Sequence, residues 1–302
     1  MKEKEFITII KNTLNSPYIG DDCAYLKDLG IVVTQDSLVE DIHFSTKFIS
    51  AFDLGFKAVM VNVSDVVASG AEPKYLTVSL SLPSNVKEDF VEEFYNGCKK
   101  ACGNDVQIVG GDITGSEKIY ISICAIGKTL GRNISSRKNA KIGQKVILSG
   151  IHGSSSAGLK LLLEGKNSPE KFIKSHINPV AQVEFGKNIS TTVKEPYAMM
   201  DTSDGLMDGL STIANESGVL LDIDFDKIPH EKDIEQFENW QDLVLFGGED
   251  YQILATVPQN FQGGFEIGVV KEGLGVNLKL RDKITHYSKQ DVEEKVFNHF
   301  KD

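Results

Sequence analysis

Short apolar segments of this chain run directly into acidic residues, and this pattern restricts the fold more than any other feature. The apolar residues 197–200 are followed by Asp201-Thr202-Ser203-Asp204-Gly205, and two earlier apolar runs are followed by Thr34-Gln35-Asp36 and Gly110-Gly111-Asp112. So many carboxylates cannot be packed into a core without polar partners. If they stand at strand ends, they can converge on one point in solvent, and we expect a common ligand there.

Length and charge set the outer limits. At 302 residues the chain exceeds the usual size of a single core, so we expect two domains, residues 1–137 and 138–302. The net charge is −11 and long Lys/Arg clusters are lacking, so we expect no nucleic-acid partner. No apolar run approaches the ~20 residues of a membrane span, and the charged first eleven residues do not resemble a signal peptide. We therefore expect a cytoplasmic protein with no membrane contact.

Strand-like and helix-like patterns alternate in both halves, which indicates an α/β or α+β fold. Neighbouring apolar runs at 106–109 and 119–126 resemble a hairpin, which favours mixed or antiparallel sheets over a doubly wound one. The expected helices include 3–14, 53–69, 86–102 and 206–216, and the expected strands include 31–33, 75–82, 119–126, 146–148, 219–225 and 251–257. In the first helix the apolar residues Phe6, Ile9, Ile10 and Leu14 share one side.

The acidic residues are candidate ligands for Mg²⁺, which prefers about six oxygen atoms and shares the phosphates of a substrate. Taken singly, each of them is most simply a turn residue or a helix N-cap. Several acids after apolar segments and beside glycines are harder to explain as surface charge. The candidates are Asp22, Asp36, Asp65, Asp112, Asp201 and Asp204, with Thr34 and Ser203 as neutral ligands.

One glycine-rich segment, Gly153-Ser154-Ser155-Ser156-Ala157-Gly158-Leu159-Lys160, resembles a phosphate-binding P-loop. That motif needs Lys directly after the second Gly, and Leu159 intervenes here. We interpret the segment as a helix start capped by serine. Gly110-Gly111 and Gly247-Gly248 would let the backbone approach a ligand closely, although each could equally form a tight turn.

Three further side chains have both a functional and an ordinary interpretation. His43 could contact an anionic substrate, but a lone histidine is more often a surface or core residue. Arg137 could bind a phosphate, or it could be a solvated charge in the connecting segment. Tyr95 could stack on a nucleotide base, whereas an aromatic residue in a helix more often fills the core.

Together these segments resemble the thiamine-monophosphate kinase family, in consistent order from about residue 5 to 300. The most specific are Asp201-Thr202-Ser203-Asp204-Gly205-Leu206 and Gly247-Gly248-Glu249-Asp250-Tyr251. The others are Ile19-Gly20-Asp21-Asp22-Cys23-Ala24, Thr34-Gln35-Asp36-Ser37-Leu38-Val39, His43-Phe44, Lys57-Ala58-Val59-Met60-Val61-Asn62-Val63-Ser64-Asp65, Gly70-Ala71-Glu72-Pro73, Val109-Gly110-Gly111-Asp112 and residues 154–159.

The resemblance implies a fold like that of aminoimidazole ribonucleotide synthetase, with an N-terminal α/β domain whose strands pair across a homodimer and a C-terminal α/β domain. It implies that the γ-phosphoryl group of ATP is transferred directly to thiamine phosphate, with several Mg²⁺ ions, giving thiamine diphosphate and ADP. Because the acceptor is a phosphate oxygen, the reaction needs charge neutralisation and positioning more than a strong base.

The resemblance also implies roles for individual residues. It gives metal positions to Asp22, Thr34, Gln35, Asp36, Asp65, Asp112, Asp201 and Asp204, among which Asp36, Asp112 and Asp204 are the candidates for catalysis. It gives ATP positions to Gly111, Asp112, Arg137 and Ser203, with Tyr95 near the adenine, and thiamine-phosphate positions to His43, Glu249 and Phe297. Two positions depart from the family. Gln35 stands where the family usually has Thr or Ser, and Phe297 stands where it usually has Trp or Tyr.

Two alternatives remain beside this kinase. One is another ATP-using synthetase or dikinase of the same superfamily. A selenide-activating dikinase would carry a reactive cysteine in an N-terminal glycine-rich segment, whereas the first cysteine here is Cys23, inside an acidic turn. The other is a nucleotide-binding scaffold without catalytic activity, which would have no need to retain every acidic position.

Overall fold

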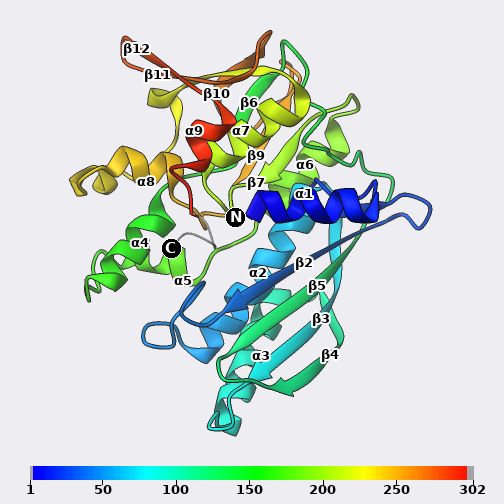
Figure 1. Cartoon of the computed structure of the whole chain (residues 1–302), viewed down its shortest axis with the longest axis vertical. Helices are drawn as coiled ribbons and strands as arrows, with labels where there is room; N and C mark the ends of the chain where they lie inside the picture. The colour runs from blue at the N-terminus through cyan, green and yellow to red at the C-terminus, as the bar shows by residue number, and fades with distance from the viewer. Residues whose placement is uncertain (1–2, 298–302) are drawn as a thin grey trace.

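The first half of the chain forms a five-stranded sheet with two helices on one face. The computed structural model describes residues 3–297, and Figure 1 shows their arrangement. The sheet order is β1-β2-β5-β3-β4. The elements are α1 (Glu3–Leu14), β1 (Ala24–Leu26), β2 (Ile31–Val39), α2 (Ala51–Ala68), β3 (Glu72–Leu82), α3 (Glu88–Cys102), β4 (Gln107–Gly115) and β5 (Tyr120–Lys128).

This first sheet is mixed, because β3 and β4 are parallel and the other pairs are antiparallel. Helices α2 and α3 pack closely against each other: a Cβ at Gly55 would lie 1.9 Å from the Phe94 carbonyl oxygen, and one at Gly97 would lie 1.8 Å from that of Phe52. Only glycine allows two backbones to approach so closely. Alternate residues of β5, such as Ile121 and Ile123, are buried toward these helices.

The second half forms a seven-stranded sheet of order β12-β11-β8-β10-β6-β9-β7. Its strands are β6 (Lys145–Leu148), β7 (Met199–Asp201), β8 (Leu220–Asp224), β9 (Ile253–Val257), β10 (Phe265–Lys271), β11 (Gly275–Leu280) and β12 (Lys283–Tyr287). The α-helices are α4 (Ser154–Leu163), α5 (Glu170–Ile177), α6 (Val183–Thr192), α7 (Leu206–Ser217), α8 (Trp240–Phe246) and α9 (Lys289–Glu293), with 3₁₀ turns η1 (Phe225–Lys227) and η2 (Lys232–Gln236). The mixed α/β class expected from the sequence is confirmed.

Helix α2 joins the two halves, since it packs on the first sheet and also contacts β7, α5 and α6. A Cβ at Gly186 of α6 would lie 2.8 Å from the Val67 carbonyl oxygen of α2, so these backbones are in close contact.

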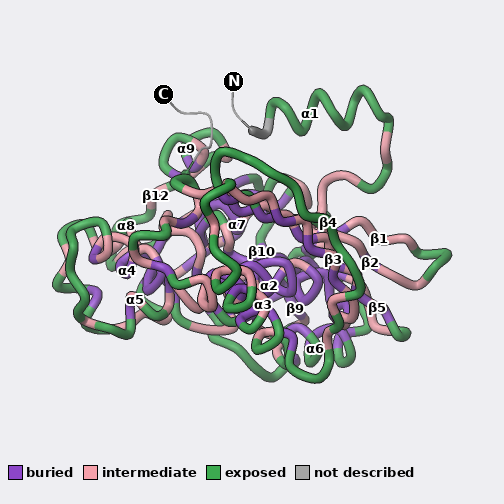
Figure 2. Tube along the Cα trace, turned by 90° about the horizontal axis from the view of Figure 1, so that it is seen from below, coloured by how far each residue is buried: buried purple, intermediate pink, exposed green. Residues whose placement is uncertain are grey.

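Residue 137 lies in the segment between β5 and β6, and the division into domains at this residue stays a prediction. Figure 2 shows the buried interior running through α2, α3, β9 and β10. Among residues 3–297, none of the helices is long and apolar enough to cross a membrane.

Two expected strand ends are wrong. Thr34-Gln35-Asp36 lies inside β2, which pairs with β5 as far as Val39, and Gly110-Gly111-Asp112 lies inside β4, which pairs with β3 as far as Gly115. The expected hairpin between 106–109 and 119–126 is also wrong, because β3 lies between β4 and β5. Of the three acidic motifs expected at strand ends, only the one that begins with Asp201 stands at the end of its strand, β7.

Candidate active site

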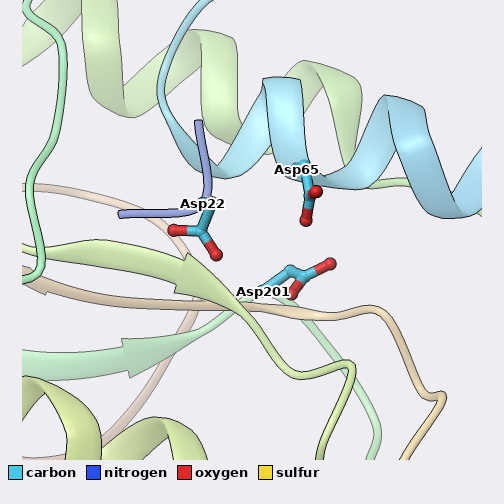
Figure 3. A group of neighbouring side chains, drawn as sticks. All are labelled: Asp22, Asp65 and Asp201. Carbon is cyan, nitrogen blue, oxygen red and sulfur yellow. The ribbon is translucent and has the colours of Figure 1, made fainter. Parts of the chain in front are cut away.

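Three carboxylates from separate parts of the chain meet between the two halves. Asp22 comes from the turn before β1, Asp65 from α2 and Asp201 from the end of β7, as Figure 3 shows. Their nearest oxygen atoms all lie within 4.8 Å of one another. These residues lie far apart in the sequence, and the packing of α2 against β7 brings Asp65 and Asp201 together.

The burial of this carboxylate group makes its negative charge costly. Burial, and then the neighbouring charges of Asp36 and Asp201, raise the pKa of Asp65 well above its ordinary value. Burial, and then the charge of Asp22, raise the pKa of Asp201 to about 7. A divalent cation would remove this penalty, and an all-oxygen ligand set is the kind that Mg²⁺ prefers. The residues therefore fit a magnesium site.

Strand β2 supplies two more polar groups on the same side. Thr34 donates from Oγ1 to the Asp65 carboxylate at 2.7 Å, and the Asp36 backbone N–H donates to Asn62 Oδ1 at 3.0 Å. The side chain of Gln35 points to the opposite face, where its Nε2 donates to Ser122 Oγ at 3.0 Å. Alternation along a strand requires this separation. A metal contact from Gln35 would therefore have to come from its backbone.

The Asp201-to-Asp204 segment is tied to the first half by a short hydrogen bond. Ser64 Oγ of α2 donates to Asp201 Oδ2 at 2.5 Å, and Ser203 Oγ donates to Asp201 Oδ1 at 3.0 Å. Asp201 is buried whereas Asp204 is exposed. One acid of the motif is thus fixed inside the group, and the other remains accessible to a ligand from solvent.

Arg137 also belongs to this site. Its Nη2 donates to Asp22 Oδ1 at 2.8 Å, and its backbone N–H donates to Asp21 Oδ1 at 2.8 Å. Within residues 3–297, its buried Nε has no hydrogen-bond partner. A buried donor without a partner is costly, and an anionic oxygen would satisfy it. Of the two interpretations of Arg137, the structure removes the solvated linker charge.

A second group of predicted residues lies elsewhere in the same chain. Tyr95, Gly111 and Asp112 line a hollow beside the edge strand β4, together with Ile108, Gly110 and Ile113. In the sheet register, Gly111 of β4 lies opposite Val78 of β3, and Val78 lies opposite Ile123 of β5. Ile123 in turn lies opposite Asp36 of β2, so three strand spacings separate Gly111 from Asp36. At the usual strand spacing this separation is about 14 Å. Asp112 and Asp36 of one chain therefore cannot share a metal ion.

The predicted substrate residues have varied surroundings. His43 lies in the loop after β2, and its Nδ1 accepts a hydrogen bond from the Val39 backbone N–H at 3.0 Å. Phe297, the last described residue, is 63% exposed. Glu249 contacts Lys57 of α2 and His176 at the end of α5.

The P-loop-like segment does begin a helix, α4, but the expected serine cap is wrong. The N-cap is Gly153, and a distant carboxylate, that of Asp250, accepts from the backbone N–H groups of Gly153 at 2.6 Å and of Ser155 at 2.8 Å. Asp250 thus occupies the helix N-terminus that a phosphate would need. The rejection of a P-loop at this position is consistent with this contact.

The buried carboxylates predict how stability depends on pH. With a chelator present, the melting temperature is expected to fall between about pH 5 and about pH 8. The reason is that Asp65 and Asp201 bind protons more tightly when folded than in the unfolded chain, so this stability is lost as they ionise. Mg²⁺ should restore more stability at the higher pH. Thermal denaturation checks this.

Asp201→Asn should flatten that pH dependence, since the amide oxygen still accepts from Ser64 but carries no titrating charge. Asp105→Asn, at an exposed site after α3, is the matched control and should leave the slope unchanged. If the melting temperature with a chelator present did not change between about pH 5 and about pH 8, the inferred cost of the buried negative charge would be contradicted.

The fold and the acidic site together define a class of protein. Residues 20–129 match the family described as AIR synthase related protein, N-terminal domain. A solved structure described as AaThiL complexed with AMPPCP and TMP has a TM-score of 0.88 and 37% identity, covering 99% of this chain and 97% of that one. The chain therefore has the fold of the AIR synthase-like superfamily.

Within that superfamily, curated relatives of this chain share one enzyme name. Thiamine-monophosphate kinase of Aquifex aeolicus is 40% identical over 286 residues, covering 89% of this chain and 92% of the relative. The enzyme of the same name from Bacillus subtilis is 33% identical over 305 residues, covering 94% and 93%. The chain belongs to the thiamine-monophosphate kinase family.

Proposed function

We propose that this protein transfers the γ-phosphoryl group of ATP directly to the phosphate of thiamine phosphate, giving thiamine diphosphate and ADP. Membership of the kinase family supports this activity. The observation that carries it here is the buried group of Asp22, Asp65 and Asp201, because transfer between two anions needs positive charge at one point. The cytoplasmic location expected from the sequence stays a prediction.

The protein has little covalent chemistry to perform. The acceptor oxygen belongs to a phosphate, whose second pKa is about 6, so it is largely ionised at neutral pH without a strong base. The chain must bring two anions together in line. Arg137, with its unpaired buried Nε, is suited to hold one phosphate oxygen, and Ser203 beside Asp201 is suited to orient another.

We assign the Mg²⁺-holding role to Asp22, Asp36, Asp65, Asp201 and Asp204, with Thr34 as a neutral neighbour and Gln35 through its backbone alone. When bound, Mg²⁺ would neutralise the phosphate charges and the buried carboxylates together. The carboxylates would fix its position, because Ser64, Thr34 and Ser203 already hold Asp201 and Asp65 in place.

We further propose that a second copy of the chain completes each site. Among the described elements, the first sheet has two long stretches of edge without a partner strand. They are the outer edge of β4, and β2 beyond Val33, where the short β1 ends. Unpaired edges invite pairing with another chain. Pairing β4 of one copy with β2 of the other would bring Asp112 toward Asp36, which it cannot reach within its own chain. The expected solution mass is twice 33.2 kDa.

Pairing between two copies would also let one ATP molecule contact all the predicted ATP-binding residues, although they lie in two places. Tyr95, Gly111 and Asp112 line the hollow at β4, whereas Arg137 and Ser203 lie at the carboxylate group. A nucleotide spanning the two copies would place its adenine near Tyr95 and its phosphates near Arg137. For the acceptor, we propose that His43, Glu249 and Phe297 contact thiamine phosphate, with Phe297 offering ring stacking but no polar contact.

Phosphorus NMR tests the reaction directly. Protein, ATP, Mg²⁺ and thiamine phosphate are mixed, and the new signals should be those of ADP and of a diphosphate on thiamine. Omitting Mg²⁺ is the control and should stop the reaction. Tight ATP binding with no turnover would support the scaffold alternative instead. Release of ADP with no diphosphate on thiamine would point to another reaction of the superfamily.

A further inference from the structure

A buried lysine of the first half contacts a candidate substrate residue of the second half. Lys57 of α2 is 1% exposed, and its Nζ lies 3.1 and 3.2 Å from the two carboxylate oxygens of Glu249. The same Nζ donates to the His176 carbonyl oxygen at 3.2 Å. The ammonium group is therefore fixed on three oxygen atoms, and both oxygens of Glu249 are held by it.

The rest of the surroundings leaves one side of Glu249 open. His176 Nδ1 lies 3.2 Å from Glu249 Oε2 and 3.1 Å from Ser155 Oγ. Burial, and then the charge of Lys57, lower the pKa of His176 to about 4, so the imidazole is neutral at pH 7. The Glu249 side chain is nevertheless 24% exposed. The Glu249 carboxylate is thus balanced by one positive charge, that of the buried Lys57, and its solvent-exposed side is accessible to a ligand.

The backbone of Glu249 is strained and is held against the Asp201-to-Asp204 segment. Its φ is +64°, a conformation that non-glycine residues rarely adopt. Its N–H donates to the Ser203 carbonyl oxygen at 2.7 Å, and a Cβ at Gly248 would lie 2.6 Å from that same oxygen. The strain and the close contact place this carboxylate next to the segment that carries Asp201 and Asp204.

An ion pair in this position is poorly explained as a source of stability alone. Desolvating two charges costs about as much as their attraction returns, so apolar residues would stabilise the contact at least as well. A carboxylate that already has a cation beside it also gains little from a second one. It remains a strong hydrogen-bond acceptor for an uncharged N–H group.

We propose that Lys57 is a positioning residue that holds the Glu249 carboxylate as a charge-balanced acceptor for the uncharged pyrimidine amino group of thiamine phosphate. The inference rests on the proposed function and adds to it which part of the substrate Glu249 reads and what prepares Glu249 for it. The cationic thiazolium ring lies elsewhere, since Lys57 disfavours a positive charge at this position.

The first test replaces Lys57 by methionine, which has similar length and no charge. The KM for thiamine phosphate should rise at least about tenfold, while the KM for ATP changes less than about twofold. Lys100→Met, at an exposed position of α3, is the matched control and should change neither. In the double variant Lys57→Met/Glu249→Gln, the KM should be no higher than in Glu249→Gln alone, because both changes remove one interaction.

The second test varies the substrate. In oxythiamine phosphate an oxygen replaces the pyrimidine amino group, so wild-type protein should show at least about a tenfold higher KM for it. Glu249→Gln should reduce that preference, since its amide can donate to the new oxygen.

An unchanged KM in folded Lys57→Met, additive effects in the double variant, or equal use of both substrates would overturn the proposal. A wild-type protein that does not phosphorylate thiamine phosphate would overturn the proposed function itself.

Discussion

Replacing Asp204 by asparagine is expected to lower kcat by at least about a hundredfold while leaving the fold and the melting temperature unchanged. Asp204 follows the buried Asp201 by three positions but is exposed, so we expect its charge to serve ligand binding and not the core. Asparagine keeps the shape and one acceptor oxygen, but it removes the negative charge that would fix a cation between the two phosphates. The loss should therefore appear in turnover.

Steady-state kinetics with thiamine phosphate and ATP, together with thermal denaturation, checks this expectation. Asp105→Asn removes an exposed carboxylate in the other half of the chain and is the matched control. Wild-type turnover by a folded Asp204→Asn protein would remove Asp204 from the catalytic machinery. Unfolding of the variant would show that the side chain has a structural role that its exposure does not indicate.

The sequence alone predicts that some of its acidic residues gather at one point, because desolvation makes unpartnered buried carboxylates costly wherever they occur. The roles of these residues in the site stay predictions. Asp22, Asp65 and Asp201 follow this logic, and their convergence is confirmed by the structure. The sequence does not predict where strands stop. An acid or a glycine pair ends a strand only if no partner strand satisfies its backbone, and β3 and β5 do so past Gly110 and past Thr34.

Pairing between distant strands is invisible to local patterns. The apolar runs 106–109 and 119–126 are close in sequence, yet β3 inserts between them and makes a parallel pair with β4. Helix α1 shows the same limit at the level of packing. The expected helix is confirmed, but Ile9, Ile10 and Leu14 on its apolar side are exposed, and the helix stands apart from the body in Figure 2.

Lys57 and Asp250 were not singled out by sequence reasoning, although both lie within the quoted motifs. Each acts through a partner far along the chain: Lys57 contacts Glu249, and Asp250 caps α4. The available signal was a charged or polar residue among apolar ones. That signal indicates that a partner exists but cannot identify it.

If each site is divided between two copies of the chain, two inactive variants should complement each other in a mixed dimer. Asp112→Asn and Asp204→Asn homodimers should each be nearly inactive, whereas a heterodimer of the two should recover about half of wild-type activity. In that heterodimer, the copy with intact Asp204 receives Asp112 from its partner, so one of the two sites is whole. The other site carries both lesions.

Co-expression of the two variants with different affinity tags, followed by purification through both tags, isolates this heterodimer for kinetic measurement. A heterodimer of two differently tagged Asp204→Asn chains is the control and should stay inactive. If instead each chain used its own Asp112, both sites of the mixed dimer would carry one lesion and no activity would return. The register already argues against that outcome, because three strand spacings separate Asp36 from Gly111 within one chain.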